Sequence, residues 1–154
     1  MNKKSKRIVL INGIYAPDRG ATAQVTNDLV GKLINDGLEV IVVCTDRSYK
    51  SAKATEVVNG EVHRVKSYGL SNGKFMRLAS AMIESFYLLR KSIRFKPDFY
   101  IICTDPPLLH LFSSFMLKEK KWALWTMDIY PEAFVANGLV GKDNIFYKWY
   151  KNTL

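Results

Sequence analysis

The chain has 154 residues, of which 48% are hydrophobic and 12% aromatic, and it carries a formal net charge of +9. This length and apolar content are sufficient for one globular domain spanning residues 1–154, and they exclude an intrinsically disordered chain. No run approaches the roughly 18 apolar residues that a membrane-spanning helix needs.

The first third of the chain predicts a strand, a helix and a second strand. Residues 7–12 form the first strand, and their apolar run is too short for a signal peptide although basic residues precede it. The helix is expected to have Thr22 as its N-cap and to end at Gly37. Its apolar stripe is expected to be Val25, Leu29, Leu33 and Ile34. Residues 38–44 are rich in β-branched side chains, which predicts a strand buried on both faces.

The middle of the chain predicts a loop, an edge strand and a long helix. Residues 45–60 are polar, whereas residues 61–66 alternate apolar and polar side chains, as a half-exposed edge strand does. Apolar side chains recur with helical spacing over residues 73–95, which predicts an amphipathic helix that ends before Pro97. Its core-facing stripe is expected to be Phe75, Ala79, Met82, Phe86, Leu89 and Ile93.

The last third of the chain completes an α/β pattern. Residues 98–103 and 122–127 predict two buried strands, with a helix between them that opens at Pro106 and Pro107. A final helical run begins near Asn144, with Ile145, Phe146, Trp149 and Tyr150 on one face. Strands that alternate with helices through short connections imply a Rossmann-like, doubly wound parallel sheet, and right-handed crossovers favour the strand order 3-2-1-4-5.

The two cysteines fit this arrangement as small buried hydrophobes. Cys44 and Cys103 lie within apolar strands that flank the first strand on opposite sides, about 10 Å apart, which is too far for a disulfide. We therefore expect a cytosolic chain with free thiols.

The positive charge comes almost wholly from two segments, the amino-terminal tail with Lys3, Lys4, Lys6 and Arg7, and residues 74–96, where Glu84 is the one acid. Local basic charge indicates an anionic partner, such as phosphate, lipid headgroups or nucleic acid. The helix in this segment also carries bulky apolar residues beyond its stripe: Met76, Ile83, Tyr87 and Leu88. It can rest on a membrane surface through Arg77, Arg90, Lys91 and Arg94, or it can be a solvated helix docked on the sheet. No RNA- or DNA-binding motif is present, so no nucleic-acid partner is expected.

The loop after the first strand, residues 13–21, lacks both the dinucleotide-binding and the phosphate-loop glycine patterns. What remains is Gly20 directly before a helix, where backbone N–H groups and the positive helix end can meet a phosphate or carboxylate. A purely structural glycine is the alternative.

Carboxylates follow the fourth and fifth strands, at the edge where a parallel sheet opens its ligand crevice. Asp105 precedes two prolines and can alternatively cap a helix. Asp128 and Glu132 are separated by a turn that contains proline, and one of them can act as a general base or bind a sugar hydroxyl. A buried structural role is the alternative for Asp128.

Several other chemistries lack support in the sequence. His63 and His110 have no Asp, Glu or Cys at ligand spacing, and no D-x-D, H-E-x-x-H or C-x-x-C pattern occurs, so no metal site is expected. No serine or cysteine has a nearby histidine that suggests a hydrolytic triad.

Five short segments, taken in order, resemble the amino-terminal half of GT-B fold glycosyltransferases, specifically the family 4 retaining enzymes of bacterial cell-surface polysaccharide assembly. The segments are residues 15–20, Gly37, residues 96–98, residues 104–108 and residues 128–132, and the D-x-x-P-E pattern of the last is the most specific. The resemblance extends from about Lys6 to about Trp149.

This resemblance implies an acceptor-side domain that faces a donor-binding domain across a cleft and uses neither metal nor cofactor. It implies that Gly20 and Ala21 approach the diphosphate of a nucleotide-sugar donor. It places Asp128 opposite the acceptor as the catalytic residue, with Tyr15, Thr104, Asp105 and Glu132 as acceptor-binding residues. The implied acceptor is a saccharide linked to polyprenyl diphosphate, at the cytoplasmic face of the plasma membrane.

These 154 residues do not include the carboxyl-terminal donor-binding half with its E-x7-E carboxylate pair, so we expect no appreciable sugar transfer by the chain alone. Two other classes stay open. One is a non-catalytic membrane or partner-binding module that recruits a separate catalytic chain. The other is a small nucleotide-binding or redox protein with a Rossmann-like fold.

Overall fold

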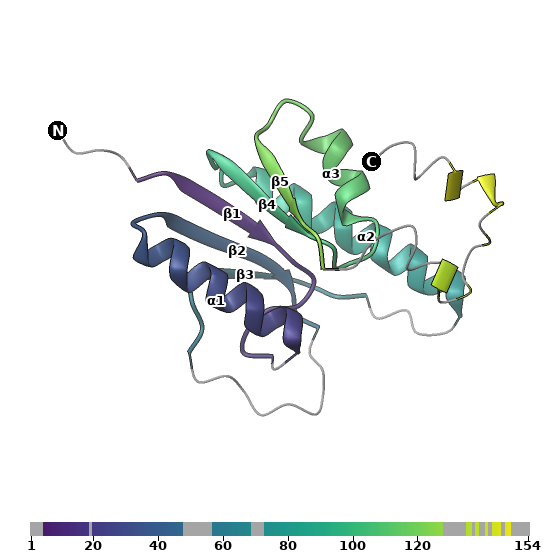
Figure 1. Cartoon of the computed structure of the whole chain (residues 1–154), viewed down its shortest axis with the longest axis horizontal. Coiled ribbons are helices and arrows are strands. Elements are labelled where there is room, and N and C mark those ends of the chain that lie inside the picture. The colour runs from purple at the N-terminus through teal and green to yellow at the C-terminus, as the bar shows by residue number, and fades with distance from the viewer. Residues whose placement is uncertain are drawn as a thin grey trace.

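The structure is a computed structural model that describes residues 5–18, 20–47, 57–68 and 73–127, together with 135–136, 138, 141, 143–145 and 147–148. In this part of the chain one parallel sheet contains β1 (Arg7–Ile11), β2 (Glu39–Thr45), β3 (Glu61–Val65), β4 (Phe99–Cys103) and β5 (Trp122–Trp125). Its order is β3-β2-β1-β4-β5, which confirms the predicted Rossmann-like α/β topology (Figure 1).

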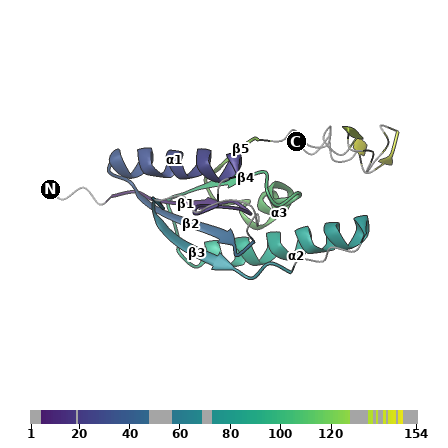
Figure 2. The ribbon, with the colours of Figure 1, turned by 90° about the horizontal axis from the view of Figure 1, so that it is seen from below.

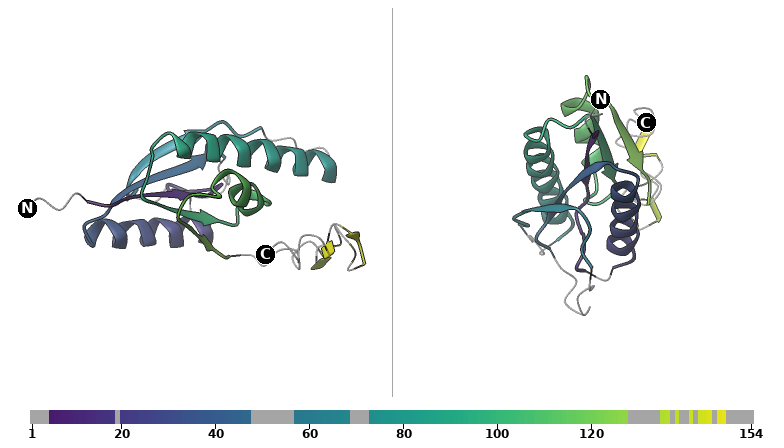
Figure 3. Two further views of the ribbon diagram at one scale, coloured as in Figure 1. Left: turned by 90° about the horizontal axis from the view of Figure 1, so that it is seen from above. Right: turned by 90° about the vertical axis from the view of Figure 1, so that its left-hand side faces the viewer.

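Helices cover both faces of the sheet. α1 (Ala21–Asn35) lies on one face, and α2 (Lys74–Ile93) and α3 (Leu109–Met116) lie on the other (Figures 2 and 3). The central strand β1 supplies side chains to both cores, because successive residues of a strand point to opposite faces. Val9 and Ile11 pack on the side of α2 and α3, whereas Leu10 packs on the side of α1.

The predicted apolar stripe of α1 is partly wrong. Val25 and Ile34 are exposed, and the buried residues of the helix are Ala23, Thr26, Asn27 and Val30. The buried face is rotated because the segment after β2 covers one side of the helix: the Asn27 amide donates to Val57 O at 3.0 Å, and its Oδ1 accepts from Asn59 N at 2.9 Å. A polar side chain that is fully hydrogen-bonded can occupy a core position.

The predicted core stripe of α2 is also partly wrong. Leu89 is buried as expected, but Met82 and Phe86 are exposed, and Leu88 is buried instead of extending outward. The side chain of Phe75 lies outside the described residues. The helix buries serines in place of these apolar residues, and Ser85 and Ser92 satisfy their hydroxyls by donating to carbonyls one turn earlier, each at 2.7 Å.

The fifth strand was expected to be buried, and it is only half-buried. β5 lies at the edge of the sheet, paired with β4 on one side, and its residues alternate between partly buried and exposed. An edge strand has no second neighbour to shield it. Ile145 is helical and exposed, as one residue of the predicted final run, while Phe146, Trp149 and Tyr150 lie outside the described residues.

Both cysteines are buried and free, in β2 and β4 on either side of β1, as predicted. Burial raises the pKa of the Cys44 thiol to about 11 and that of the Cys103 thiol to about 12. Both thiols are therefore neutral near pH 7, which makes them poor nucleophiles.

Candidate functional site

The candidate site lies where the sheet order changes direction, between β1 and β4. The chain leaves β1 toward α1 on one face and leaves β4 toward α3 on the other, so the two loops separate outside the carboxyl ends of these strands. This is the position at which open α/β sheets bind ligands. The two loops are joined at their start, because Gly13 N donates to Asp105 O at 2.6 Å.

Arg47 and Asp105 form an ion pair at this position. The Nη2 atom of Arg47 lies 2.8 Å from Oδ1 and 2.7 Å from Oδ2 of Asp105. Gly13 allows this close approach: a Cβ at Gly13 would overlap the Asp105 carboxylate and would lie 2.9 Å from Arg47 Nη2. Both side chains are only partly buried, so the pair is accessible from outside.

Glu84 of α2 adds a second carboxylate to this pair. It is buried, its Oε1 accepts a hydrogen bond from Ser67 Oγ at 2.5 Å, and its Oε2 lies 3.9 Å from Arg47 Nη1. We refer to Gly13, Arg47, Glu84 and Asp105 as the switch-point cluster. The sequence did not predict that Arg47 would lie between the carboxylates of Glu84 and Asp105. Glu84 nevertheless stands out in the sequence as the one acid of a basic helix.

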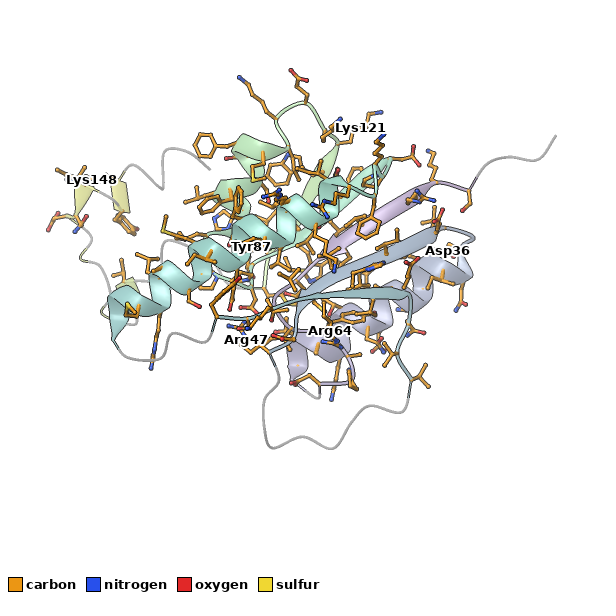
Figure 4. The ribbon with its side chains drawn as sticks, turned by 180° about the vertical axis from the view of Figure 1, so that it is seen from behind. Asp36, Arg47, Arg64, Tyr87, Lys121 and Lys148 are labelled. Carbon is orange, nitrogen blue, oxygen red and sulfur yellow. The ribbon has the colours of Figure 1, made fainter. Side chains whose placement is uncertain are left out.

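A second arginine holds the loops around the cluster in place. Arg64 of β3 donates through Nη2 to Ala16 O at 2.5 Å and through Nη1 to Thr45 O at 3.2 Å. Asn12, buried at the end of β1, donates to Ile14 O at 2.8 Å. Figure 4 shows Arg47 and Arg64 at one end of the sheet and Asp36 at the other. A polar residue at the end of the predicted first strand was the sequence signal that could have identified Asn12 as part of this site.

The amino-terminal end of α1 lies on the loop after β1. The helix begins at Ala21 with Gly20 as N-cap, so the prediction of Thr22 as N-cap is wrong. Among the described residues no side chain caps the first turn, and this turn contains no acid, whereas Gly20 N donates to Asp18 Oδ1 at 2.7 Å. Gly20 and Ala21 therefore occupy a helix end whose partial positive charge favours an anion.

The other predicted acceptor-binding residues differ in their placement. Thr104 follows β4 and its Oγ1 accepts from Met127 N at 3.3 Å, which brings the ends of β4 and β5 together beside Asp105. Tyr15 is buried in the core on the α1 side, where its hydroxyl donates to Asn59 O at 2.8 Å, so its side chain is not accessible from outside. Asp128 and Glu132 lie outside the described residues.

The predicted membrane-surface residues also have distinct positions. Arg77, Arg90 and Arg94 are exposed, on α2 and at its C-cap. Lys91 is partly buried, and its Nζ donates to Arg64 O at 3.0 Å, so it ties α2 to β3. Among the described residues, no helix is long and apolar enough to cross a bilayer.

The described residues contain no group of three or more His, Cys, Asp or Glu side chains that could hold a metal ion. His63 is paired with Glu61 at 2.6 Å on the edge strand, and His110 is buried in α3. In these positions His63 takes part in a surface pair and His110 packs in the core.

His110 makes the stability of the fold depend on pH. Desolvation lowers its pKa from 6.5 to about 4, so the unfolded chain takes up this proton at higher pH than the folded one does. Above about pH 6.5 His110 is neutral in both states and does not lower the free energy of unfolding. As the pH decreases from about 6.5 toward 4, the free energy of unfolding falls. In urea titrations, the loss between about pH 7.5 and 5 should be about 1–2 kcal/mol smaller in His110→Gln than in the wild type. Equal losses in both proteins would contradict this assignment.

The fold and the switch-point cluster define a Rossmann-like α/β protein with a polar, charged site at the carboxyl edge of its sheet. A comparison with models of known protein families finds no match for this chain, and a search of curated proteins finds no matching relative.

Proposed function

We propose that the chain is the acceptor-side domain of a glycosyltransferase that moves a sugar from a nucleotide-sugar to a saccharide linked to polyprenyl diphosphate. In this proposal a donor-binding domain completes the active site, and the chain alone is inactive. The main support is the switch-point cluster, which combines two carboxylates and a guanidinium at the ligand-binding edge of a parallel sheet.

The charges of the cluster favour the saccharide part of such an acceptor over its phosphates. Carboxylates accept hydrogen bonds from sugar hydroxyls, and the guanidinium of Arg47 donates to them. A bare phosphate would meet the negative charges of both Asp105 and Glu84 around that single cation. We assign the donor diphosphate to the start of α1 at Gly20 and Ala21, where the first turn contains no acid and its backbone N–H groups point toward the helix end, while the Gly20 N–H itself is held by Asp18.

The first test measures how much a sugar adds to binding. The probes are a short-chain prenyl diphosphate that carries one hexosamine and the same prenyl diphosphate without sugar, both titrated by calorimetry. Wild type should bind the sugar-bearing probe more tightly, and Asp105→Asn should reduce this preference about tenfold or more, since it removes a charged hydrogen-bonding partner. Asp36→Asn is the matched control, because Asp36 is exposed at the opposite end of the sheet.

Three outcomes would argue against the proposal. If the sugar adds no affinity, or if Asp105→Asn and Asp36→Asn behave alike, the cluster does not bind the acceptor. Tight binding of a free nucleotide or flavin by the wild-type chain would instead support a small nucleotide-binding or redox protein. Sugar transfer in the presence of a donor-binding domain, lost in Asp105→Asn, would be the strongest support.

A second candidate is a non-catalytic module that binds a membrane or a partner. The observation that favours it is the exposed apolar side of α2, which the acceptor role does not require. The acceptor-side domain should bind the saccharide through Asp105, whereas a non-catalytic module should show no saccharide binding that depends on Asp105.

A further inference from the structure

The outward side of α2 exposes large apolar side chains next to arginines. Met76, Ile83, Phe86 and Tyr87 are all exposed, although a soluble surface helix normally presents polar residues to water. The opposite side of the helix is buried against the sheet and includes Ala81, Ser85, Leu88 and Ser92. The apolar character of α2 therefore exceeds what docking on the sheet requires.

Residues outside α2 extend this apolar surface. Tyr68 stacks on Tyr87 with ring centroids 5.8 Å apart, and a groove of about 450 Å³ runs between Tyr68, α2 and Phe112 of α3. Phe115, also on α3, is 67% exposed. A contiguous apolar patch of this kind on a surface marks an interaction site.

The charge of this surface has a single sign. Arg90 and Arg94 continue the same side of the helix beyond Tyr87, at the helical spacing of three and four residues. The one acid of α2, Glu84, is buried and directed to Ser67 and Arg47. The exposed side of α2 consequently offers apolar groups and positive charge without any carboxylate.

We propose that this surface docks on an anionic lipid membrane. We call it the α2 docking face and define it as Met76, Ile83, Phe86, Tyr87, Arg90 and Arg94. Apolar side chains enter the boundary between headgroups and acyl chains, and the arginines contact lipid phosphates. A second copy of the chain is a poorer occupant, since pairing two such helices would cover the arginines with no acid on α2 to meet them.

This docking does not depend on the saccharide-binding role of the switch-point cluster, because it is carried by different side chains. The two are connected through α2, which holds Glu84 next to Arg47 and presents Ile83 outward. Docking would keep the cluster close to the bilayer surface, where a lipid-linked saccharide is found.

Vesicle flotation tests the proposal with the intact chain. The vesicles contain phosphatidylcholine alone or with about 30% phosphatidylglycerol. Wild type should float with the anionic vesicles and bind the neutral ones much more weakly. The double variant Ile83→Glu with Phe86→Glu should lower the partition coefficient at least about tenfold, since it places charge where apolar groups enter the membrane.

The matched control is Val25→Glu with Ile34→Glu on α1. Val25 and Ile34 are 45% and 39% exposed, close to the 41% of Phe86 and 37% of Ile83, but they lie on the other face of the sheet. This control should float as the wild type does.

A second pair of variants tests the electrostatic part. Arg90→Glu with Arg94→Glu should reduce binding to anionic vesicles about 25-fold or more, because each basic residue at such a surface contributes roughly fivefold. Lys6→Glu with Lys32→Glu produces the same change in net charge at exposed positions away from α2 and should have a much smaller effect.

Three results would overturn the proposal. They are equal binding to neutral and anionic vesicles, equal losses in the α2 and control variants, and a wild-type dimer in solution that Ile83→Glu with Phe86→Glu converts to monomer. The last would assign the α2 docking face to a second copy of the chain. Thermal unfolding of each variant checks that the fold is retained.

Discussion

Replacement of Leu88 by alanine is expected to lower the free energy of unfolding by about 2–5 kcal/mol, a large part of the stability of a domain of this size. Leu88 is 0% exposed and belongs to the core cluster formed by β1, β2, β4, α2 and α3. Its truncation removes apolar contacts and leaves a cavity that the rigid sheet cannot close. Equilibrium unfolding in urea measures the loss.

Met82→Ala is the matched control for this substitution. Met82 lies on the same helix and was expected from the sequence to face the core, but it is 44% exposed. Its truncation should cost less than about 1 kcal/mol. A larger loss for Met82→Ala than for Leu88→Ala would mean that α2 packs on the sheet through its predicted stripe, and equal losses would contradict the burial seen in the structure.

Gly60→Ala is expected to destabilise the protein by about 2–4 kcal/mol. Gly60 has a φ of +81°, and an added Cβ would lie 2.9 Å from Val30 Cγ1 and 3.2 Å from the backbone oxygen of Val40. The substitution therefore combines an unfavourable backbone conformation with a clash that includes rigid main chain. Urea unfolding of the purified variant gives the change in free energy.

Gly37→Ala separates these two effects. Gly37 has nearly the same φ, +83°, but nothing lies within 4 Å of the position of its Cβ. It should lose about 1 kcal/mol from the backbone conformation alone. The difference between the two variants measures the close packing of Gly60 between α1 and β2, and equal losses would show that this packing contributes nothing.

These substitutions concern the framework that holds the switch-point cluster. The segment at Gly60 also positions Asn59, whose carbonyl accepts the Tyr15 hydroxyl and whose amide donates to Asn27 O at 3.0 Å. Tyr15 thus anchors the loop after β1 to the segment that contains Asn59. Loosening this support is expected to affect ligand binding through the loop and not through a direct contact.

Much of the candidate site lies between residues that are far apart in the sequence. The strand-end rule located Asp105, because a carboxylate after an apolar run is visible without a structure. It did not identify Arg47 or Glu84 as its neighbours. Arg47 follows β2 within a polar segment, and Glu84 comes from the middle of a helix. The contacts of Arg47 with Glu84 and Asp105 depend on the path of the chain after β2 and on which side of α2 faces the sheet.

The sequence by itself determined the strands, their order and the burial of both cysteines. Apolar runs of strand length favour a parallel sheet covered by helices, and short right-handed crossovers leave few possible orders. Only the tertiary structure decided which sides of α1 and α2 face the sheet and which charges meet at the switch point. α2 has apolar residues around most of its circumference, so several orientations bury similar apolar area. The choice between them rests on small side chains and satisfied hydroxyls that pack closely against β1 and β2, and on the part-buried hydrogen bond from Ser67 to Glu84.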